Sequence, residues 1–218
     1  MNISNKAMAS WLLIFGSILA LVVWIGLEPL IVKEYTSPEE FLGRMKAVGD
    51  VGALITLLGA VFFLAQIVGT VMFARQLGEG GSGAAIGNIA AILGVVLAAG
   101  VIVSNDLSLS ALAAGDKADG AAAMTLSQVG FYSGASFGMF FGLTYFCLSI
   151  PMIGQASNMF QKVLGYLLGL LTLVMIISTL AGLDLGGDEG ISFILGIVIW
   201  LGLVVVLVLT GIANLRQK

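Results

Sequence analysis

The sequence contains no histidine, one cysteine and three prolines, and only 10% of its 218 residues are charged. The missing histidine removes the commonest general base and the commonest transition-metal ligand. The single cysteine, Cys147, excludes an intramolecular disulfide, and its apolar surroundings favour a buried, inert thiol. Nine Lys and Arg against twelve Asp and Glu leave no basic surface for phosphates, so nucleic acid is not expected as a partner.

The abundant residues are hydrophobic ones, which make up 59% of the chain and occur in long uncharged runs. This fraction lies above that of soluble domains, so we expect the chain to be embedded in a lipid bilayer. Six runs have the ~20-residue length that an α-helix needs to cross a bilayer. They cover about 8–30, 51–74, 84–104, 126–150, 163–183 and 191–213. The sequence therefore predicts an all-α fold, a polytopic membrane helix bundle that forms one transmembrane domain over residues 1–218.

The first hydrophobic run ends at Glu28-Pro29, where proline is expected to end or kink the helix. A cleaved signal peptide is the alternative for such an N-terminal run. The run is longer than the apolar part of a typical signal peptide, and no small-x-small cleavage site follows it. We therefore expect a retained membrane span.

Between the first two runs, the stretch Ser37-Pro38-Glu39-Glu40 has the features of a helix start. Serine is a good N-cap, proline fits the first helical position, and a glutamate follows three residues after the serine. A helix over 38–48 would carry its apolar residues at helical spacing. We therefore expect a short interfacial helix here. The alternative is one long, kinked second helix.

With six spans, both termini lie on the same side of the membrane. That side carries five basic residues against the acidic Glu79. The basic residues are Lys6, Arg75, Lys162, Arg216 and Lys218. The opposite side carries four basic residues, so the positive-inside rule favours cytoplasmic N- and C-termini in the cell (cytoplasmic, inner) membrane.

Glycine is frequent, with 30 among 218 residues, and it recurs every fourth residue in the fourth run. The repeat consists of Gly130, Gly134, Gly138 and Gly142, and the fifth run repeats the spacing with Gly165 and Gly169. Residues four apart share one helix face, and glycine there lets another helix approach closely. We expect these glycines to pack helices together, within the chain rather than across a dimer interface.

Three stretches match known motifs in part, but none has the context that its chemistry needs. Gly134-Ala-Ser136-Phe-Gly138 satisfies G-x-S-x-G, yet it lies in a helical run and no histidine can take the serine proton. The glycine-rich stretch 80–87 lacks the spacing and the Lys-Ser/Thr pair of a phosphate-binding loop. Leu185-Gly-Gly-Asp188 is similar to the aspartate motif of intramembrane aspartyl proteases, but it lies in an acidic loop without a second intramembrane aspartate.

Polar residues near the ends of the runs are the remaining candidates for a site, because ionisable groups at membrane depth are costly. Six of them could line a shallow, outward-facing pocket. They are Glu28, Asp50, Asp106, Gln128, Tyr132 and Ser136. A structural role for these residues is favoured over a functional one. Gln66 lies near mid-membrane, where we expect an interhelical hydrogen bond.

The order of these elements resembles a bacterial family of six-span integral membrane proteins that is catalogued only as a domain of unknown function. The resemblance covers most of the chain and rests on Glu28, Arg44 and the stretch Phe160-Gln-Lys-Val-Leu-Gly165. That stretch is similar to the family's Phe-Pro-Lys-hydrophobic-Leu-Gly before its fifth span. The chain departs from the family at Gln161, where proline is usual, and it lacks the histidine often found in the fourth span. The family has no assigned activity, so the resemblance implies no catalytic role.

We expect a non-enzymatic protein that packs with other membrane proteins as an accessory or assembly subunit, because no catalytic constellation is visible. Its expected partners are the lipid bilayer and either a membrane protein or a second copy of the chain. No cofactor and no metal site are expected. The alternative is a small transporter, channel or lipophile-binding protein that uses the outer polar pocket. An intramembrane enzyme ranks third, since it would need chemistry without histidine.

Overall fold

The computed structural model describes residues 4–32, 37–116, 120–182 and 190–216, and side chains at 115–116, 131–136 and 190–193 lie outside the described set. The helices within these ranges are α1 (Asn5–Leu21), η1 (Val22–Leu27), α2 (Glu28–Ile31), α3 (Pro38–Val48), α4 (Asp50–Gly78), α5 (Ala84–Asp116), α6 (Gly120–Gly154), α7 (Met159–Leu180) and α8 (Gly190–Arg216). Six helical segments of the described chain are long and apolar enough to cross a membrane. The predicted six-span helical bundle is thus confirmed.

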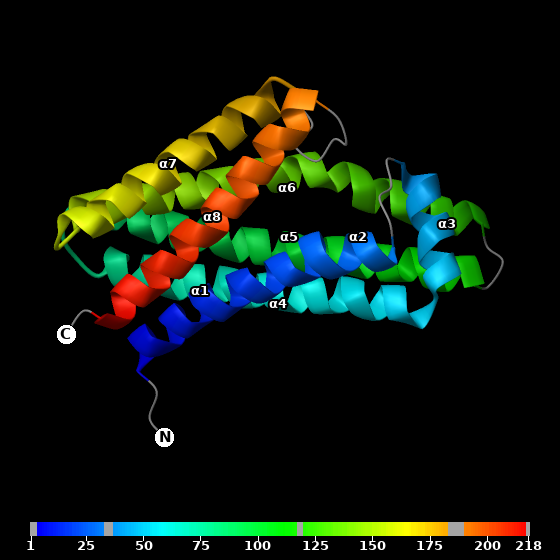
Figure 1. Cartoon of the computed structure of the whole chain (residues 1–218), viewed down its shortest axis with the longest axis horizontal. Helices are drawn as coiled ribbons and strands as arrows, with labels where there is room; N and C mark the ends of the chain where they lie inside the picture. The colour runs from blue at the N-terminus through cyan, green and yellow to red at the C-terminus, as the bar shows by residue number, and fades with distance from the viewer. Residues whose placement is uncertain (1–3, 33–36, 117–119, 183–189, 217–218) are drawn as a thin grey trace.

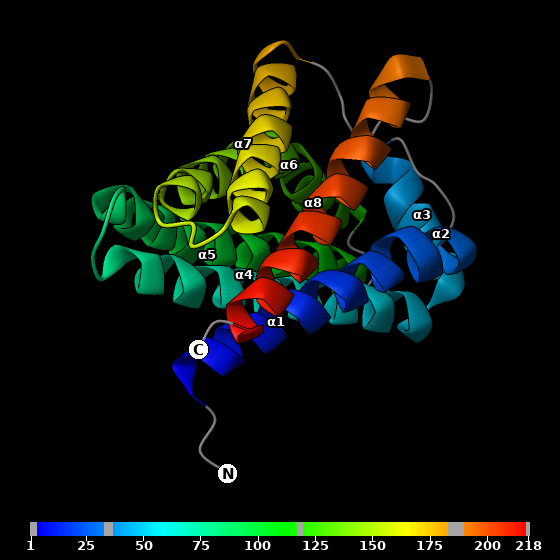
Figure 2. The same ribbon diagram turned by 60° about the vertical axis from the view of Figure 1, so that its left-hand side comes forward.

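Most helices run roughly along the long axis of the molecule, with α1 beside α4 and α5 beside α6 (Figure 1). Both termini, the α4–α5 turn and the α6–α7 turn lie at one end, which we call the termini end. Helix α3 lies at the opposite end, which we call the α3 end. Helix α8 packs against both α1 and α7, and Figure 2 shows this arrangement from a second direction. The α4–α5 and α6–α7 turns therefore lie at the end of the bundle opposite to α3.

The first span is continuous from Asn5 to Ile31 but changes its helix type on the way. The Ser4 hydroxyl caps its start by accepting a hydrogen bond from the Ala7 amide at 3.2 Å. The segment η1 is a π-helix, and α2 follows it with Pro29 in its first turn. The proline therefore follows a π-helical turn instead of ending the span. Single π-turns within helices are rare and frequently mark functional positions.

Helix α3 begins as the sequence predicts. The Ser37 hydroxyl accepts a hydrogen bond from the Glu40 amide at 3.2 Å, and Pro38 occupies the first helical position. A short helix between the first and second spans is thus confirmed, and the alternative of one long, kinked second helix is not what forms.

A second, smaller core lies at the α3 end and joins α3 to α5 and α6. Its buried residues are Val32, Phe41, Leu42, Met45, Ala111 and Ala123. The Ser127 hydroxyl adds a buried hydrogen bond to the Pro38 carbonyl at 3.2 Å. The apolar face of α3, predicted to lie at the membrane interface, is therefore covered by the protein itself.

Helices α5 and α6 extend beyond the runs predicted for spans three and four. The predicted runs end at about 104 and begin at about 126, whereas α5 continues to Asp116 and α6 begins at Gly120. At 1.5 Å per residue, helices of 33 and 35 residues are about 50 Å long, longer than the ~30 Å hydrocarbon core. Hydropathy reports where a helix crosses the lipid and not where it ends, so the hydrophobic runs do not mark the ends of these two helices.

The main core runs through the centre of the bundle, where Phe63, Phe141 and Tyr145 are almost completely buried. The Gln66 amide donates a hydrogen bond to the Tyr145 hydroxyl at 3.0 Å, and the Thr70 hydroxyl lies 3.0 Å from the same oxygen. This bond links α4 to α6. The interhelical hydrogen bond predicted for Gln66 is confirmed.

Candidate functional site

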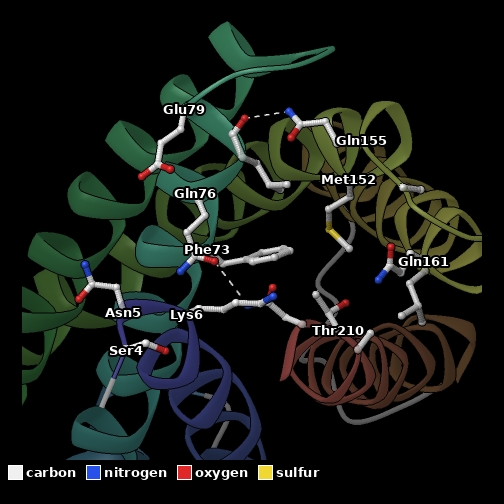
Figure 3. Close-up of a pocket in the computed structure, with 15 residues that line it drawn as sticks. Ser4, Asn5, Lys6, Phe73, Gln76, Glu79, Met152, Gln155, Gln161 and Thr210 are labelled. Atoms are coloured by element: carbon white, nitrogen blue, oxygen red, sulfur yellow. Dashed lines mark hydrogen bonds between the residues drawn. The ribbon is translucent and has the colours of Figure 1, made fainter. Parts of the chain in front are cut away.

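The termini end of the bundle holds a cavity of about 560 Å³, which we call the termini-end cavity. Its polar lining residues are Ser4, Asn5, Lys6, Gln76, Glu79, Gln155, Gln161, Thr210 and Asn214. Its apolar lining residues are Phe73, Leu77, Met152, Ala156, Leu164 and Ala213. Figure 3 shows these side chains around one space, with contributions from the ends of α1, α4, α6, α7 and α8. The volume lies within the range of about 300–1,000 Å³ that is typical of small-molecule sites.

Asn214 connects three helices at one wall of this cavity. Its Nδ2 atom donates to Ser10 Oγ at 3.0 Å and, more weakly, to Gln76 Oε1 at 3.4 Å. Ser10 in turn donates to the Lys6 carbonyl at 2.9 Å. These bonds hold the ends of α1, α4 and α8 together and fix the Gln76 amide at the cavity wall.

The opposite wall is fixed by two further glutamines. Gln155 Nε2 donates to the Leu77 carbonyl at 2.8 Å and to the Ser82 carbonyl at 3.1 Å. Gln161 Oε1 accepts hydrogen bonds from the amide and the hydroxyl of Ser157, at 3.0 and 2.8 Å, which closes the turn before α7. Side-chain bonds to turns therefore determine the shape of this wall.

Two polar groups at the cavity wall are buried and have no hydrogen-bond partner in the described structure. They are Gln76 Nε2 and Thr210 Oγ1, and the Thr210 side chain belongs to a residue that is only 4% exposed. Other buried hydroxyls in this bundle donate to the carbonyl one turn back, as Thr172 does to Leu168 at 2.7 Å. A buried polar group without a partner costs about 1–3 kcal/mol. Both residues line the cavity, so the two unpartnered groups lie beside it.

The cavity is apolar and closed on its inner side. Phe73 and Met152 line it there. Closer to the bundle centre along α1, α4 and α8, three completely buried side chains follow: Leu13, Ile67 and Leu207. The cavity therefore combines polar and apolar lining and suits a ligand with one polar and one apolar part.

Charged side chains occur only at two positions among the described lining residues. Lys6 is half-buried and Glu79 is exposed. The other polar lining groups are carboxamides and hydroxyls, which both donate and accept hydrogen bonds. Recognition at this site would therefore depend on hydrogen bonds more than on net charge.

The residues predicted to form an outward-facing pocket lie elsewhere. Three of them are exposed: Asp50, Asp106 and Gln128. Glu28 is half-buried directly after the π-helix. The side chains of Tyr132 and Ser136 lie outside the described residues. The four described side chains do not line the termini-end cavity, and the outward-facing pocket stays a prediction.

Three of the glycines singled out in the sequence lie where α6 meets α7. A Cβ atom at Gly142 would lie 2.7 Å from Ile176 Cγ1 on α7. A Cβ atom at Gly169 would lie 2.9 Å from Ser149 Oγ on α6, and Gly165 approaches α6 at a similar distance. The neighbours at these positions belong to the same chain.

The remaining glycines of the repeat are less crowded. Cβ atoms at Gly130 and Gly138 would have ordinary contacts of 3.6 and 3.7 Å, and Gly134 lies outside the described side-chain positions. A closer approach occurs at Gly16, where a Cβ atom would lie 2.5 Å from the Gln66 amide nitrogen. The sequence gives no signal for this contact, because Gly16 lies outside any regular glycine repeat.

The six apolar helices make the chain a polytopic membrane protein. Among the described residues, no group of three or more Cys, Asp or Glu side chains is placed to hold a metal ion. Comparisons with protein-family models, with curated proteins and with solved structures found no match. Membership in the six-span family of unknown function therefore stays a prediction.

Proposed function

We propose that this protein is a non-enzymatic membrane protein that binds a small amphiphilic molecule in the termini-end cavity. The observation that carries the proposal is the presence of two buried, unpartnered groups, Gln76 Nε2 and Thr210 Oγ1, in one cavity. An amide nitrogen donates, and a hydroxyl can donate or accept. Ligand groups that bond to each of them would remove the cost of leaving them without a partner.

The lining indicates the chemistry of the ligand. Carboxamides and a hydroxyl recognise uncharged or zwitterionic oxygen-rich groups, such as glycerol-type hydroxyls and ester carbonyls. Phe73 and Met152 offer a surface for an adjoining apolar part. A lipid from the bilayer and a soluble amphiphile share this chemistry.

The distribution of basic residues supports a cytoplasmic position for the cavity. Lys6, Arg75, Lys162 and Arg216 lie at the termini end or in its turns. Positive charge concentrates in short cytoplasmic loops of membrane proteins. We propose that the cavity opens to the cytoplasmic face of the cell membrane and takes its ligand from that side.

Binding has more support than the other functions considered for this chain. A channel is disfavoured because Leu13, Ile67 and Leu207 close the cavity toward the bilayer centre. Glycines such as Gly142 and Gly169 approach helices of the same chain, as the sequence predicts, so they give an accessory subunit no additional support.

Native mass spectrometry of the full chain, released from mild detergent, tests the proposal. The informative variants are Thr210→Val, which keeps the shape of the side chain, and Gln76→Leu. The matched control is Thr144→Val, because Thr144 is equally buried but donates to the Phe140 carbonyl at 2.7 Å and does not line the cavity.

We expect wild type and Thr144→Val to carry the same bound molecule, and the two cavity variants to bind it about fivefold to tenfold more weakly and so to show lower occupancy, since one hydrogen bond is worth about that change in affinity. The mass of the bound molecule distinguishes a lipid from a soluble amphiphile. Equal occupancy in all four proteins would contradict the proposal, as would wild-type protein without any bound molecule after extraction into native-lipid nanodiscs.

A further inference from the structure

A second cavity, of about 130 Å³, lies inside the bundle, which we call the aromatic cavity. Residues of α1, η1, α4, α6 and α8 line it, near the middle of the spans. Along α1, α4 and α8, it lies on the other side of Leu13, Ile67 and Leu207 from the termini-end cavity. The two cavities are therefore separate sites.

Four aromatic rings from four helical segments follow one another along the wall of this cavity. The ring centroids of Trp24 and Phe63 are 4.8 Å apart, those of Phe63 and Phe141 are 5.7 Å apart, and those of Phe141 and Trp200 are 5.0 Å apart. Aromatic pairs are favourable at centroid distances of about 4.5–7 Å. A flat aromatic guest would extend this series of ring contacts.

The π-helix η1 presents Trp24 to the cavity. The indole lies against α4 where that helix has Gly59, and a Cβ atom there would lie 2.5 Å from Trp24 Nε1. A side chain at position 59 would therefore displace the ring. The π-turn and the glycine together set the position of one cavity wall, in agreement with the frequent occurrence of π-turns at functional sites.

Ser17 supplies an unused hydroxyl at this cavity. The residue is completely buried, and its Oγ atom has no hydrogen-bond partner in the described structure. About two turns earlier on the same helix, the Ser10 hydroxyl donates to the Lys6 carbonyl, so helix α1 permits the usual local bond. Gln66 also lines the cavity, but its amide nitrogen donates to the Tyr145 hydroxyl at 3.0 Å. The Ser17 hydroxyl therefore offers a further hydrogen bond inside a largely aromatic and aliphatic space.

The aromatic cavity reaches the lipid-facing surface of the bundle. Ile25 lines the cavity and is 49% exposed, and Val204 of α8 lines it on the neighbouring helix. In a membrane-spanning chain, an exposed apolar residue at this depth faces lipid. A molecule dissolved in the bilayer can therefore enter sideways.

We propose that the aromatic cavity binds a single aromatic ring that carries a hydroxyl or carbonyl oxygen and is taken up from the bilayer. The ring packs among Trp24, Phe63 and Trp200, and its oxygen bonds to Ser17 Oγ. The size is suitable, because an apolar cavity of about 150 Å³ binds benzene. An acyl chain would fill the space but leave Ser17 without a partner. This inference does not rest on the function proposed for the termini-end cavity.

The test uses tryptophan fluorescence and a matched pair of probes, 4-bromophenol and bromobenzene, which differ by one hydroxyl. Bromine quenches tryptophan at contact, and the chain has three tryptophans. The variant Trp11→Phe keeps only Trp24 and Trp200, which both line the cavity. The variant Trp24→Phe/Trp200→Phe keeps only Trp11, which is 46% exposed and reports partition into detergent or lipid.

We expect saturable quenching by 4-bromophenol in the Trp11→Phe protein and unsaturable quenching in the protein that keeps only Trp11. Adding Ser17→Ala should weaken 4-bromophenol binding about fivefold and leave bromobenzene binding unchanged, because one hydrogen bond is lost. Adding Ala20→Leu, which fills the cavity, should abolish saturable quenching by both probes.

Three outcomes would overturn the proposal. Linear quenching in the Trp11→Phe protein would mean that the cavity binds no ring. If Ser17→Ala leaves the 4-bromophenol affinity unchanged and binds the two probes equally well, no oxygen contact exists. The cavity would then be a general apolar site. Saturable quenching that survives Ala20→Leu would place the ligand elsewhere. If size-exclusion chromatography shows that Ala20→Leu does not fold, the comparison of the two probes in Ser17→Ala still decides between the outcomes.

Discussion

The two ends of the bundle are closed in different ways. At the α3 end, six apolar residues from α3, α5, α6 and the position directly after α2 pack into a small second core, and the Ser127 hydroxyl bonds to the Pro38 carbonyl. At the termini end, carboxamides and hydroxyls surround a cavity, and Gln76 and Thr210 each keep one buried atom without a partner. Packed apolar groups stabilise a fold, whereas unpartnered polar groups destabilise it. Apolar packing therefore closes the α3 end, whereas polar side chains around a cavity form the termini end.

The length of two helices explains the closed α3 end. Helices α5 and α6 are longer than the hydrocarbon core is thick, so part of each extends beyond it. Their apolar faces at Ala111 and Ala123 would otherwise meet water, and α3 covers them with Phe41 and Met45. Helix α3 therefore has a packing role that is independent of the termini-end cavity.

Met45→Ala should have the largest effect and should be confined to the α3 end. Met45 is 1% exposed in the second core, and truncation of a buried methionine costs about 2–5 kcal/mol. We expect α3 to undock while the main core stays intact. Hydrogen exchange of residues 38–48 should rise strongly, and exchange around the termini-end cavity should not change.

The control is Lys46→Ala, since Lys46 lies on the exposed side of the same helix. This variant should change the free energy of hydrogen exchange in residues 38–48 by less than about 0.5 kcal/mol, as expected for a surface substitution. Faster exchange at both ends of the bundle in Met45→Ala would mean that the two ends are not independent, and the comparison would fail.

Gln155→Leu should have the second largest effect and should be confined to the termini end. The substitution removes the two hydrogen bonds from Gln155 Nε2 and leaves the Leu77 and Ser82 carbonyls without them, at a cost of about 1–3 kcal/mol. We expect faster hydrogen exchange in the α4–α5 turn and unchanged exchange in α3.

Gln128→Leu is the matched control, because Gln128 is an exposed glutamine on α6 at the far end of that helix from Gln155. This variant should not change exchange in the α4–α5 turn. An equal response of the turn to both substitutions would show that loss of a polar group on α6, and not loss of these two bonds, is responsible.

Features that depend on local pattern are the ones that the sequence predicts well. The six spans follow from the length of the uncharged runs, and the start of α3 follows from Ser37 and Pro38. Gln66 is predictable as well, because an amide in the middle of an apolar run must find a partner in another helix.

The termini-end cavity could not be predicted in the same way. Gln76, Gln155 and Thr210 are far apart in the sequence, and each lies near the end of a span, where polar side chains ordinarily face water. Only the convergence of α1, α4 and α8 buries two of them. The position of α3 was similarly open, because an amphipathic helix fits a membrane surface as well as a protein surface.

The smallest effects on stability are expected from removing two helix caps. One cap lies at each end of the bundle, so the two substitutions compare the ends directly. Ser37 caps α3 by accepting from the Glu40 amide, and Asn158 caps α7 by accepting from the Gln161 amide at 3.0 Å. Replacing either by alanine should cost about 1 kcal/mol. The consequences should differ, because α3 has 11 residues and α7 has 22.

A short helix is held by few packing contacts, so loss of its cap should raise hydrogen exchange along all of α3. Helix α7 is packed against α6 beyond its first turn, so Asn158→Ala should raise exchange only near Gln161. If Asn158→Ala instead raises exchange along the whole of α7, the termini end is held by its caps and not by helix packing. The wall of the termini-end cavity that includes Gln161 would then be far less rigid than the α3 end. Under the proposed function, ligand occupancy of this cavity should then fall when the cap is removed.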